Sequence, residues 1–205
     1  MSALPNRDRK AERREATRRE IVEAAWDVAH DEGLEGVTLR AVAERVGMRS
    51  PSLYTHFESK NAIYDAMFGQ AWADYLAIIE AQQGTLPAQP RKALLVMMRT
   101  FVDYNAEDLV RFQIMNTRVV HDFTPSEASY APSVRVMEIF VSRLADIGIT
   151  DREDVDLVAA MIGGLIDSRF ANDPTGDRYI RQLPRAVDML ADECGLPGPR
   201  LRKTR

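Results

Sequence analysis

The sequence of 205 residues predicts an all-α protein, in which a small helix-turn-helix unit precedes a larger helical unit. Three observations predict this fold class. Apolar residues recur at helical spacing along most of the chain, and the alternation typical of strands is sustained nowhere. Breaks rich in Gly and Pro separate the helical stretches at residues 84–90, 121–125, 148–150 and 173–176.

Residues 38–49 predict a short helix and then a tight turn. Thr38 is suited to cap the helix. Gly47 stands where a helix ends with positive φ, and Met48 with Arg49 completes a turn of the length found in helix-turn-helix pairs. One apolar stripe comprises Leu39, Val42, Ala43 and Val46.

Residues 50–60 predict a second helix suited to a DNA groove. Ser50 is expected to cap it, with Pro51 at its first position. At about 100° per residue, one side carries Leu53, Tyr54 and Phe57, and the opposite side carries Ser52, Thr55 and His56. The second set is short and polar, which suits base edges and phosphates in a major groove about 12 Å wide, and Arg49 adds a cation at the entry.

Periodicity alone is equally compatible with a helical hairpin on a protein surface. The features occur in a fixed order: a capping residue, an apolar stripe, a glycine turn, a Ser-Pro helix start and an aromatic pair. This order favours DNA binding. Over residues 18–68 the chain resembles the tetracycline-repressor-type (TetR) family of bacterial transcription regulators. The matching positions are Ile21, Ala24, Ala25, Gly33, Thr38, Ala43, Gly47, Leu53, Tyr54, His56, Phe57, Ser59 and Lys60. Met48 and Arg49 stand where the family often has Val and Ser.

The motif and the resemblance together define the expected DNA-contacting residues. The resemblance implies that Lys60 lies beside a phosphate, whereas a solvated surface lysine is the alternative. The expected set is Thr38, Arg49, Ser50, Ser52, Tyr54, Thr55, His56 and Lys60.

The first twenty residues are rich in cations, namely Arg7, Arg9, Lys10, Arg13, Arg14, Arg18 and Arg19. Attraction to phosphates is one interpretation; before Arg13, a solvated disordered tail is equally compatible. The chain has 27 Lys and Arg against 31 Asp and Glu and a net charge of -4. A net negative charge does not exclude DNA binding, because the electrostatic field at the DNA-contacting face, and not the total charge of the chain, determines the attraction to DNA.

Composition narrows the class of protein. With 45% hydrophobic residues the chain can bury a sizeable core. No apolar run reaches the roughly 18 residues of a membrane span and the N-terminus is charged, so we expect a cytoplasmic protein with no membrane partner. Cys194 is the only cysteine. Catalytic motifs are absent, and His30, His56 and His121 lack metal-ligand spacing, so we expect no enzyme activity, no metal and no cofactor.

Two helices are expected to form the centre of the larger unit. A helix over 59–81 would join the DNA-reading part to the rest of the chain, and a helix over 91–105 is apolar on nearly every side. The resemblance implies a ligand cavity here, although ordinary core remains the default for any single residue. The candidate pocket residues are Tyr75, Met97, Phe101, Tyr104, Asn105, Arg111, Phe112, Met115, Met137 and Phe140.

The last helices are expected to form a homodimer. Residues 150–153 have capping-box spacing and open a helix that is apolar on almost all sides, so a second chain is expected to cover one face. In the family the last two helices form a four-helix dimer interface. The candidate interface residues are Leu157, Ala160, Met161, Gly164, Leu183, Val187 and Leu190. Pro184 either kinks the final helix or begins it, and Pro132 is expected to interrupt the helix that starts near Thr124.

These expectations combine into one functional hypothesis. Residues 1–60 would bind DNA, and residues 82–205 would bind an effector and dimerise. The protein would then be a dimeric repressor, released from a near-palindromic double-stranded DNA operator by a small apolar ligand. The alternatives are an activator or a ligand-independent regulator of the same fold and, with thinner support, a helical ligand carrier or an enzyme.

Overall fold

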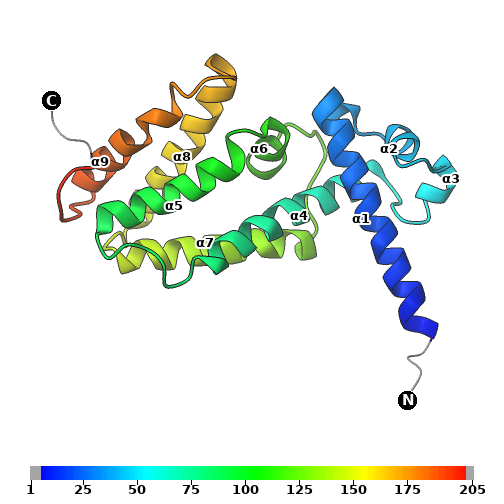
Figure 1. Cartoon of the computed structure of the whole chain (residues 1–205), viewed down its shortest axis with the longest axis horizontal. Helices are drawn as coiled ribbons and strands as arrows, with labels where there is room; N and C mark the ends of the chain where they lie inside the picture. The colour runs from blue at the N-terminus through cyan, green and yellow to red at the C-terminus, as the bar shows by residue number, and fades with distance from the viewer. Residues whose placement is uncertain (1–5, 202–205) are drawn as a thin grey trace. The chain divides into compact units, whose positions relative to one another are not determined.

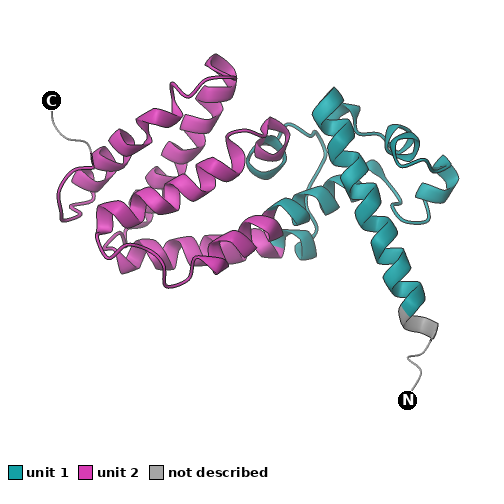
Figure 2. Cartoon of the chain, in the orientation of Figure 1, with its two compact units in different colours: residues 1–71, 113–130 teal, residues 72–112, 131–205 magenta. Residues whose placement is uncertain are grey.

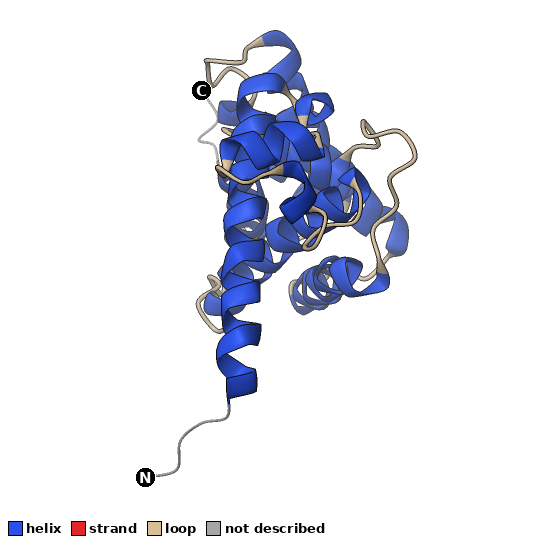
Figure 3. Cartoon of the chain, turned by 90° about the vertical axis from the view of Figure 1, so that its right-hand side faces the viewer, coloured by secondary structure: helices blue, strands red, loops and turns tan. Residues whose placement is uncertain are grey.

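The computed structural model describes residues 6–201, with side chains from Arg9 onward. The predicted role of Arg7 therefore lies outside the described side chains. Within the described range the chain forms helices and no strand (Figures 1 and 3), which confirms the all-α fold class. The α-helices are α1 (Asn6–Glu32), α2 (Leu39–Arg45), α3 (Ser50–Leu53), α4 (Lys60–Ala81), α5 (Pro90–Asn105), α6 (Leu109–Asn116), α7 (Glu127–Asp146), α8 (Arg152–Asn172) and α9 (Leu183–Glu193). Two 3-10 helices, η1 (Leu34–Gly36) and η2 (Ile180–Gln182), complete them.

The chain divides into two compact units (Figure 2). Unit 1 comprises residues 1–71 and 113–130, and unit 2 comprises residues 72–112 and 131–205. The boundary differs from the expected division at residues 60 and 82, because it falls inside α4, between Ala71 and Trp72. The sequence carries no signal that groups residues 113–130 with the N-terminal part, since that grouping arises from tertiary contacts.

Unit 1 is built around α1, whose C-terminal half packs against η1 and α2. Its buried residues recur at helical spacing, so one face of this half of α1 is covered. The core side chains of unit 1 include Ile21, Ala25, Val28, Val37, Val42, Leu53, Phe57, Ile63 and Met67, each at most 1% exposed. The Tyr64 hydroxyl donates a hydrogen bond to the carbonyl oxygen of Leu34 at 2.5 Å, which ties α4 to η1.

Unit 2 has a core formed mainly by α5, α8 and α9, to which α6 adds Phe112 and α7 adds Leu144. α5 is buried on several sides, as expected for a central helix, and its N-terminal Arg91 is only 8% exposed. The Arg91 guanidinium donates to Asp192 at 2.6 Å and to the carbonyl oxygen of Leu196 at 3.1 Å, and lies 3.6 Å from Asp188 Oδ1. These bonds fasten α9 and the segment after it to α5. No helix of the described residues is long and apolar enough to span a membrane.

Two helix starts differ by one residue from the sequence prediction. Arg49, rather than Ser50, is the N-cap of α3, so Ser50 is its first residue and makes no side-chain cap. Asp151, rather than Thr150, caps α8, and its carboxylate accepts from the Glu153 backbone N–H at 2.7 Å. Helix ends are uncertain by one or two residues when read from sequence, because Ser, Thr and Asp can all cap.

Pro132 and Pro184 affect their helices differently. The expected interruption at Pro132 is wrong, because this residue lies in the second turn of α7, which continues to Asp146. A proline this close to a helix start removes few backbone hydrogen bonds, so the helix tolerates it. Pro184 is the second residue of α9 and comes directly after η2, so it begins the last helix instead of kinking it.

Candidate nucleic-acid interface

The turn between α2 and α3 has the predicted backbone. Thr38 caps α2, and its hydroxyl accepts from the Ala41 N–H at 3.0 Å. Gly47 stands after α2 with a φ of 72°, a value that L side chains rarely adopt. The Met48 N–H then donates to the Ala43 carbonyl oxygen at 2.8 Å. This pattern closes the end of α2 and directs the chain into α3.

α3 contains only four residues, Ser50–Leu53, and two buried side chains hold it in place. Leu53 is 0% and Phe57 is 1% exposed. Tyr54 is 54% exposed, so the prediction that it shares the anchoring side is wrong. The regular α-helix ends at Leu53 and residues 54–56 continue as turns, so a strict period of 3.6 residues does not predict which of these side chains are buried. The exposure of Tyr54 is compatible with its separate prediction as a DNA contact.

The residues between the two anchors present polar atoms to the surface. Ser52 and Thr55 are exposed, and the Thr55 hydroxyl donates to the Ser52 carbonyl oxygen at 2.7 Å. His56 is half-buried, and its Nδ1 is enclosed without a hydrogen-bond partner among the described residues. The turn therefore offers the hydroxyl groups of Ser52, Tyr54 and Thr55 on one short stretch of chain.

Cations border this stretch on both sides. Arg49 precedes it and is exposed. Lys60, the first residue of α4, comes after it and is also exposed, with its Nζ 5.5 Å from the centroid of the Tyr64 ring. Two of the predicted DNA-contacting side chains therefore stand at the ends of the polar segment. Thr38 is exposed as well, at the start of α2.

Two arginines of α1 reach the same segment, which the sequence did not indicate. The Arg14 guanidinium lies 3.5 Å from the carbonyl oxygen of Thr55. The Arg18 guanidinium donates to the carbonyl oxygen of His56 and lies 4.1 Å above the centroid of the Phe57 ring. Arg18 is thus used to hold the end of the segment. Helical spacing placed both arginines on one side of α1, but only tertiary structure identifies their partners.

The first turns of α4 are held by residues 122–130 of the same unit. The Asp65 carboxylate accepts from the Ser126 N–H at 2.6 Å and from the hydroxyls of Ser126 and Ser129, both at 2.8 Å. Asn61 donates to the Asp122 carbonyl oxygen at 3.1 Å. Beside these bonds the aromatic rings of four residues pack together, namely Tyr64, Phe68, Phe123 and Tyr130. The helix after the polar segment is therefore fixed on one face.

Some of the predicted pocket residues lie together in unit 2. The ring centroids of Tyr75 and Phe101 are 5.2 Å apart, and those of Tyr75 and Tyr104 are 5.3 Å apart. The Arg111 guanidinium covers the Tyr104 ring at 4.5 Å. Burial raises the pKa of Tyr104 to about 12 and also raises the pKa of Tyr75. Trp72, which was not among the candidates, joins this aromatic cluster.

The other pocket candidates are dispersed. Met97 and Phe112 are buried in the main core of unit 2, and Asn105 is 0% exposed with its Oδ1 lacking a hydrogen-bond partner among the described residues. Phe140 is half-buried against that core. Met137 is 49% exposed and Met115 belongs to unit 1. A helical stripe does not distinguish a residue that lines a cavity from one that faces solvent, as the exposed Met137 shows.

The predicted interface residues separate into two groups. Leu183, Val187 and Leu190 are at most 2% exposed, because the apolar side of α9 packs onto the core of its own chain. They are therefore not available on the surface of a single chain. Leu157, Ala160 and Gly164 are exposed on α8, and Met161 is half-buried. Met189 of α9, which the sequence did not single out, is 57% exposed.

The family model of the bacterial regulatory proteins of the tetR family matches residues 21–67. These residues cover the packed half of α1, the turn, α3 and the first turns of α4. Over this segment, less than a quarter of its length, the chain is similar to the tetR family.

Relatives of known sequence match over a similarly short stretch. The tetracycline repressor protein class C of Escherichia coli is 42% identical over 50 residues, which is 24% of this chain and 23% of the repressor. The class A repressor from transposon 1721 of Escherichia coli is 43% identical over 47 residues, or 23% of this chain and 22% of that protein. The match thus spans less than a quarter of the length of these relatives.

Solved structures extend the similarity of fold to most of the chain. The TetR family transcriptional regulator PfmR from Thermus thermophilus has a TM-score of 0.63 at 22% identity, covering 83% of this chain and 96% of that one. The regulator FadR from Bacillus subtilis, solved with stearoyl-CoA, has a TM-score of 0.64 at 15% identity, covering 83% and 96%. The tetR-type fold therefore includes the helices of unit 2.

Proposed function

We propose that this chain is a dimeric DNA-binding transcriptional repressor, which a small apolar ligand releases from a near-palindromic operator. The observation that carries this proposal is the polar turn at residues 52–56. Its hydroxyl groups face solvent while Leu53 and Phe57 anchor it, and it lies within the segment that matches the tetR family.

The exposed side chains suit the two kinds of contact that a sequence-specific protein makes. Ser52 and Tyr54 carry hydroxyls that can donate to or accept from base edges in the major groove. The Thr55 hydroxyl, which donates to the Ser52 carbonyl oxygen, can accept from them. Arg49 and Lys60 would bind phosphates on either side and fix the register of the turn on the duplex. A segment this short makes few base contacts, so useful specificity requires two copies.

The exposed face of α8 is the proposed dimer interface. Leu157, Ala160 and Gly164 share one side of this helix, and Met189 adds an apolar side chain from α9. Apart from its chain neighbours and the adjacent backbone of α8, no heavy atom of the described residues lies within 4 Å of a Cβ atom added at Gly164, so a partner helix has room to approach. A two-fold dimer would read two half-sites about 34 to 36 Å apart.

The aromatic cluster of unit 2 supports an apolar ligand. Trp72, Tyr75, Phe101 and Tyr104 are the kind of side chains that line small-molecule sites, and Arg111 beside Tyr104 could orient a polar group. The FadR structure with stearoyl-CoA indicates that this fold can accept an acyl compound. Release would require that the ligand bind one conformation more tightly, with a coupling of roughly 1 to 3 kcal/mol.

A binding selection tests the proposal. The purified protein is incubated with a pool of duplexes carrying a randomised region, the bound fraction is recovered over several rounds at rising salt, and the retained sequences are determined. We expect enrichment of an inverted repeat, because a two-fold dimer presents two identical reading segments. Salt-sensitive binding without a motif, or no binding, would contradict a sequence-specific regulator.

A further inference from the structure

α1 extends well beyond the residues that pack against the rest of unit 1. It begins at Asn6, yet its first fully buried residue is Ile21, and residues 9–15 are all exposed. Figures 1 and 3 show this N-terminal part running clear of α2 and α3. At 1.5 Å per residue the stretch from Asn6 to Ala16 is about 15 Å long. Its sequence from Arg9 to Ala16 contains only strong helix formers, which explains why it is helical without packing.

The charges of this extension are separated on two sides of the helix. At about 100° per residue, its cations fall within an arc of roughly 140°. Among the described side chains, from Arg9 to Ala16, the cations are Arg9, Lys10, Arg13 and Arg14. Glu12 and Glu15 fall on the opposite side. A helix that only needs to be soluble has no reason to sort its charges in this way, because mixed charges solvate it equally well.

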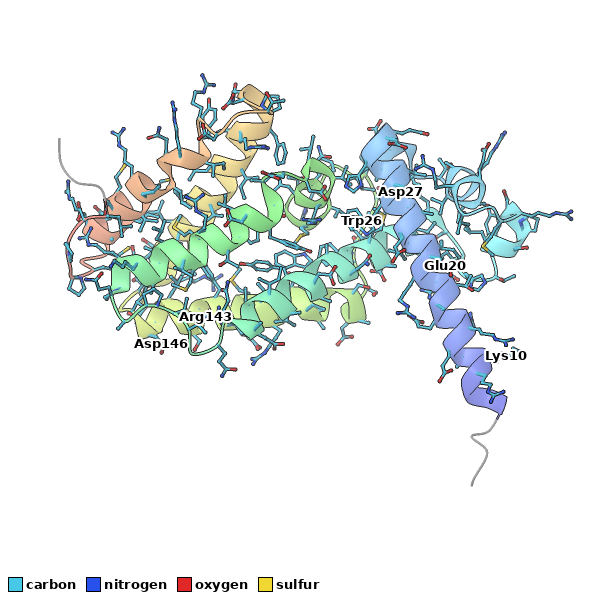
Figure 4. All side chains as sticks on the ribbon, viewed as in Figure 1. Lys10, Glu20, Trp26, Asp27, Arg143 and Asp146 are labelled. Atoms are coloured by element: carbon cyan, nitrogen blue, oxygen red, sulfur yellow. The ribbon has the colours of Figure 1, made fainter. Side chains whose placement is uncertain are left out.

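The basic side adjoins the proposed DNA-reading segment. In the same helical projection, Ile21, Ala24 and Val28 fall within the arc of the cations, and these three residues pack into unit 1. Lys10 points to the side of α1 on which α2 and α3 lie (Figure 4). The last cation of the arc, Arg14, lies 3.5 Å from the carbonyl oxygen of the exposed Thr55. The basic side therefore continues directly from the polar turn.

We propose that the N-terminal part of α1, through Arg9, Lys10 and Arg13, is a second DNA-binding surface that contacts the phosphates flanking each operator half-site. The proposal rests on the proposed DNA-binding function and extends it beyond the helix-turn-helix. Duplex DNA carries one negative charge per about 1.7 Å of axis, so about nine phosphate charges fall within a length of about 15 Å. These contacts add affinity without reading sequence.

The test compares two duplexes that carry the same selected operator. The short duplex ends at the outer edges of the half-sites, and the long duplex has about one further helical turn on each side. The full-length chain is compared with the triple variant Arg9→Gln, Lys10→Gln and Arg13→Gln, since glutamine removes the charge and preserves the helix. Kd is measured by fluorescence anisotropy over a range of salt concentrations.

We expect the triple variant to bind the short duplex like the parent chain. On the long duplex its Kd should rise about tenfold or more near 0.1 M salt, and the log-log salt slope should decrease by about 2 to 3. Equal Kd values for the two proteins on the long duplex would overturn the proposal, and so would equal losses on both duplexes. A parent chain that binds neither duplex would instead contradict the proposed function itself.

A matched pair of single variants controls for total charge. Arg13→Gln and Arg19→Gln each remove one exposed arginine from α1. The two arginines differ in position, because Arg19 lies on the side of Glu12. Only Arg13→Gln should weaken binding to the long duplex. Equal effects of the two variants would indicate general electrostatic attraction and would contradict a defined surface.

Discussion

Arg18 is a cation whose described contacts are made within the protein rather than with solvent. Its guanidinium donates to the His56 carbonyl oxygen and lies over the Phe57 ring, so both contacts go to the end of the polar turn. A side chain committed in this way orients its neighbours, whereas one that binds phosphate must reach into solvent. Salt dependence separates these two roles, because only a phosphate contact releases counterions.

Arg18→Ala is therefore expected to weaken operator binding with an unchanged salt slope. The free energy of unfolding should also fall by about 1 to 2 kcal/mol, since a cation–π contact and a charged hydrogen bond are lost. Urea denaturation and salt-titrated anisotropy provide the two measurements. A slope lowered by about one with unchanged stability would identify Arg18 as a phosphate contact.

Lys60→Ala should give the opposite result. Lys60 is exposed at the start of α4 and has no acidic partner within ion-pair distance among the described residues. Its loss should weaken binding similarly on all sequences and lower the log-log salt slope by about one. The control is Lys92→Ala, an exposed lysine on α5. An unchanged slope for Lys60→Ala would exclude the phosphate contact.

At the scale of elements, the junction between α4 and α7 depends on Asp65. One carboxylate satisfies a backbone N–H and two hydroxyls at the start of α7. Gly69, one turn further along α4, allows close approach, because a Cβ there would lie 3.1 Å from the Ser129 side chain. Asp65 therefore holds the first turn of α7 against the helix that comes after the polar turn.

Replacing Asp65 by Ala should lower the free energy of unfolding by about 1 to 3 kcal/mol, because the Ser126 N–H and two hydroxyls lose a charged acceptor. Hydrogen exchange at the Ser126 amide should accelerate. Asp103→Ala is the matched control, since its only described ion pair is a surface contact with Arg99 at 3.8 Å, which contributes little. Similar losses for both variants would argue against a special role of Asp65.

Helices were predictable where local chemistry alone determines them. Thr38, Gly47 and the stripe of α2 define that helix through capping, positive φ and periodicity, and the structure agrees on the cap and on the positive φ. Periodicity failed at Tyr54, because α3 ends after four residues. It also failed to separate the buried Leu183 of α9 from an exposed interface residue, since both occur on an apolar stripe. The contacts of Arg18 and Asp65 join residues about 40 and 60 positions apart, for which a single sequence carries no signal.

At the scale of the whole molecule, a substitution in α8 tests whether this helix forms the proposed dimer interface. Gly164→Leu adds a large side chain at a position where, in the described part of the chain, no heavy atom beyond its chain neighbours and the adjacent backbone of α8 lies within 4 Å of the new Cβ. The isolated chain should tolerate it and gain about 0.5 to 1 kcal/mol from the loss of a helical glycine. The proposed dimer should nevertheless dissociate, because the added side chain would separate the partner helices.

Sedimentation velocity measures this outcome directly. Ala145→Leu, at an exposed position of α7, is the control and should remain dimeric. A Gly164→Leu protein that still sediments as a dimer would locate the interface elsewhere.

The stability of the fold at low pH is expected to depend on the interaction between Arg91 of α5 and Asp192 of α9. The hydrogen bond from Arg91 holds the pKa of Asp192 below its usual value, and the charge of Arg200 acts in the same direction. A carboxyl with a lowered folded pKa contributes stability above its unfolded pKa of about 4, and this contribution is lost as the pH falls through the folded value.

Asp192→Asn should therefore lower Tm at neutral pH. The difference in Tm from the parent chain should shrink as the pH falls below about 4, where Asp192 becomes protonated in the parent as well. Thermal unfolding across a pH series checks this. A Tm difference that is independent of pH would show that the carboxylate charge is not responsible.

The polar turn between Leu53 and Phe57 also bears on how such a protein could acquire a new target. The two buried anchors fix the backbone, whereas Ser52, Tyr54 and Thr55 are exposed and contribute little to the core. Under the proposed function, substitutions at these three positions would therefore alter base recognition at small cost to folding. Retargeting such a regulator to another promoter would then require only a few codon changes, with the remaining chain kept as it is.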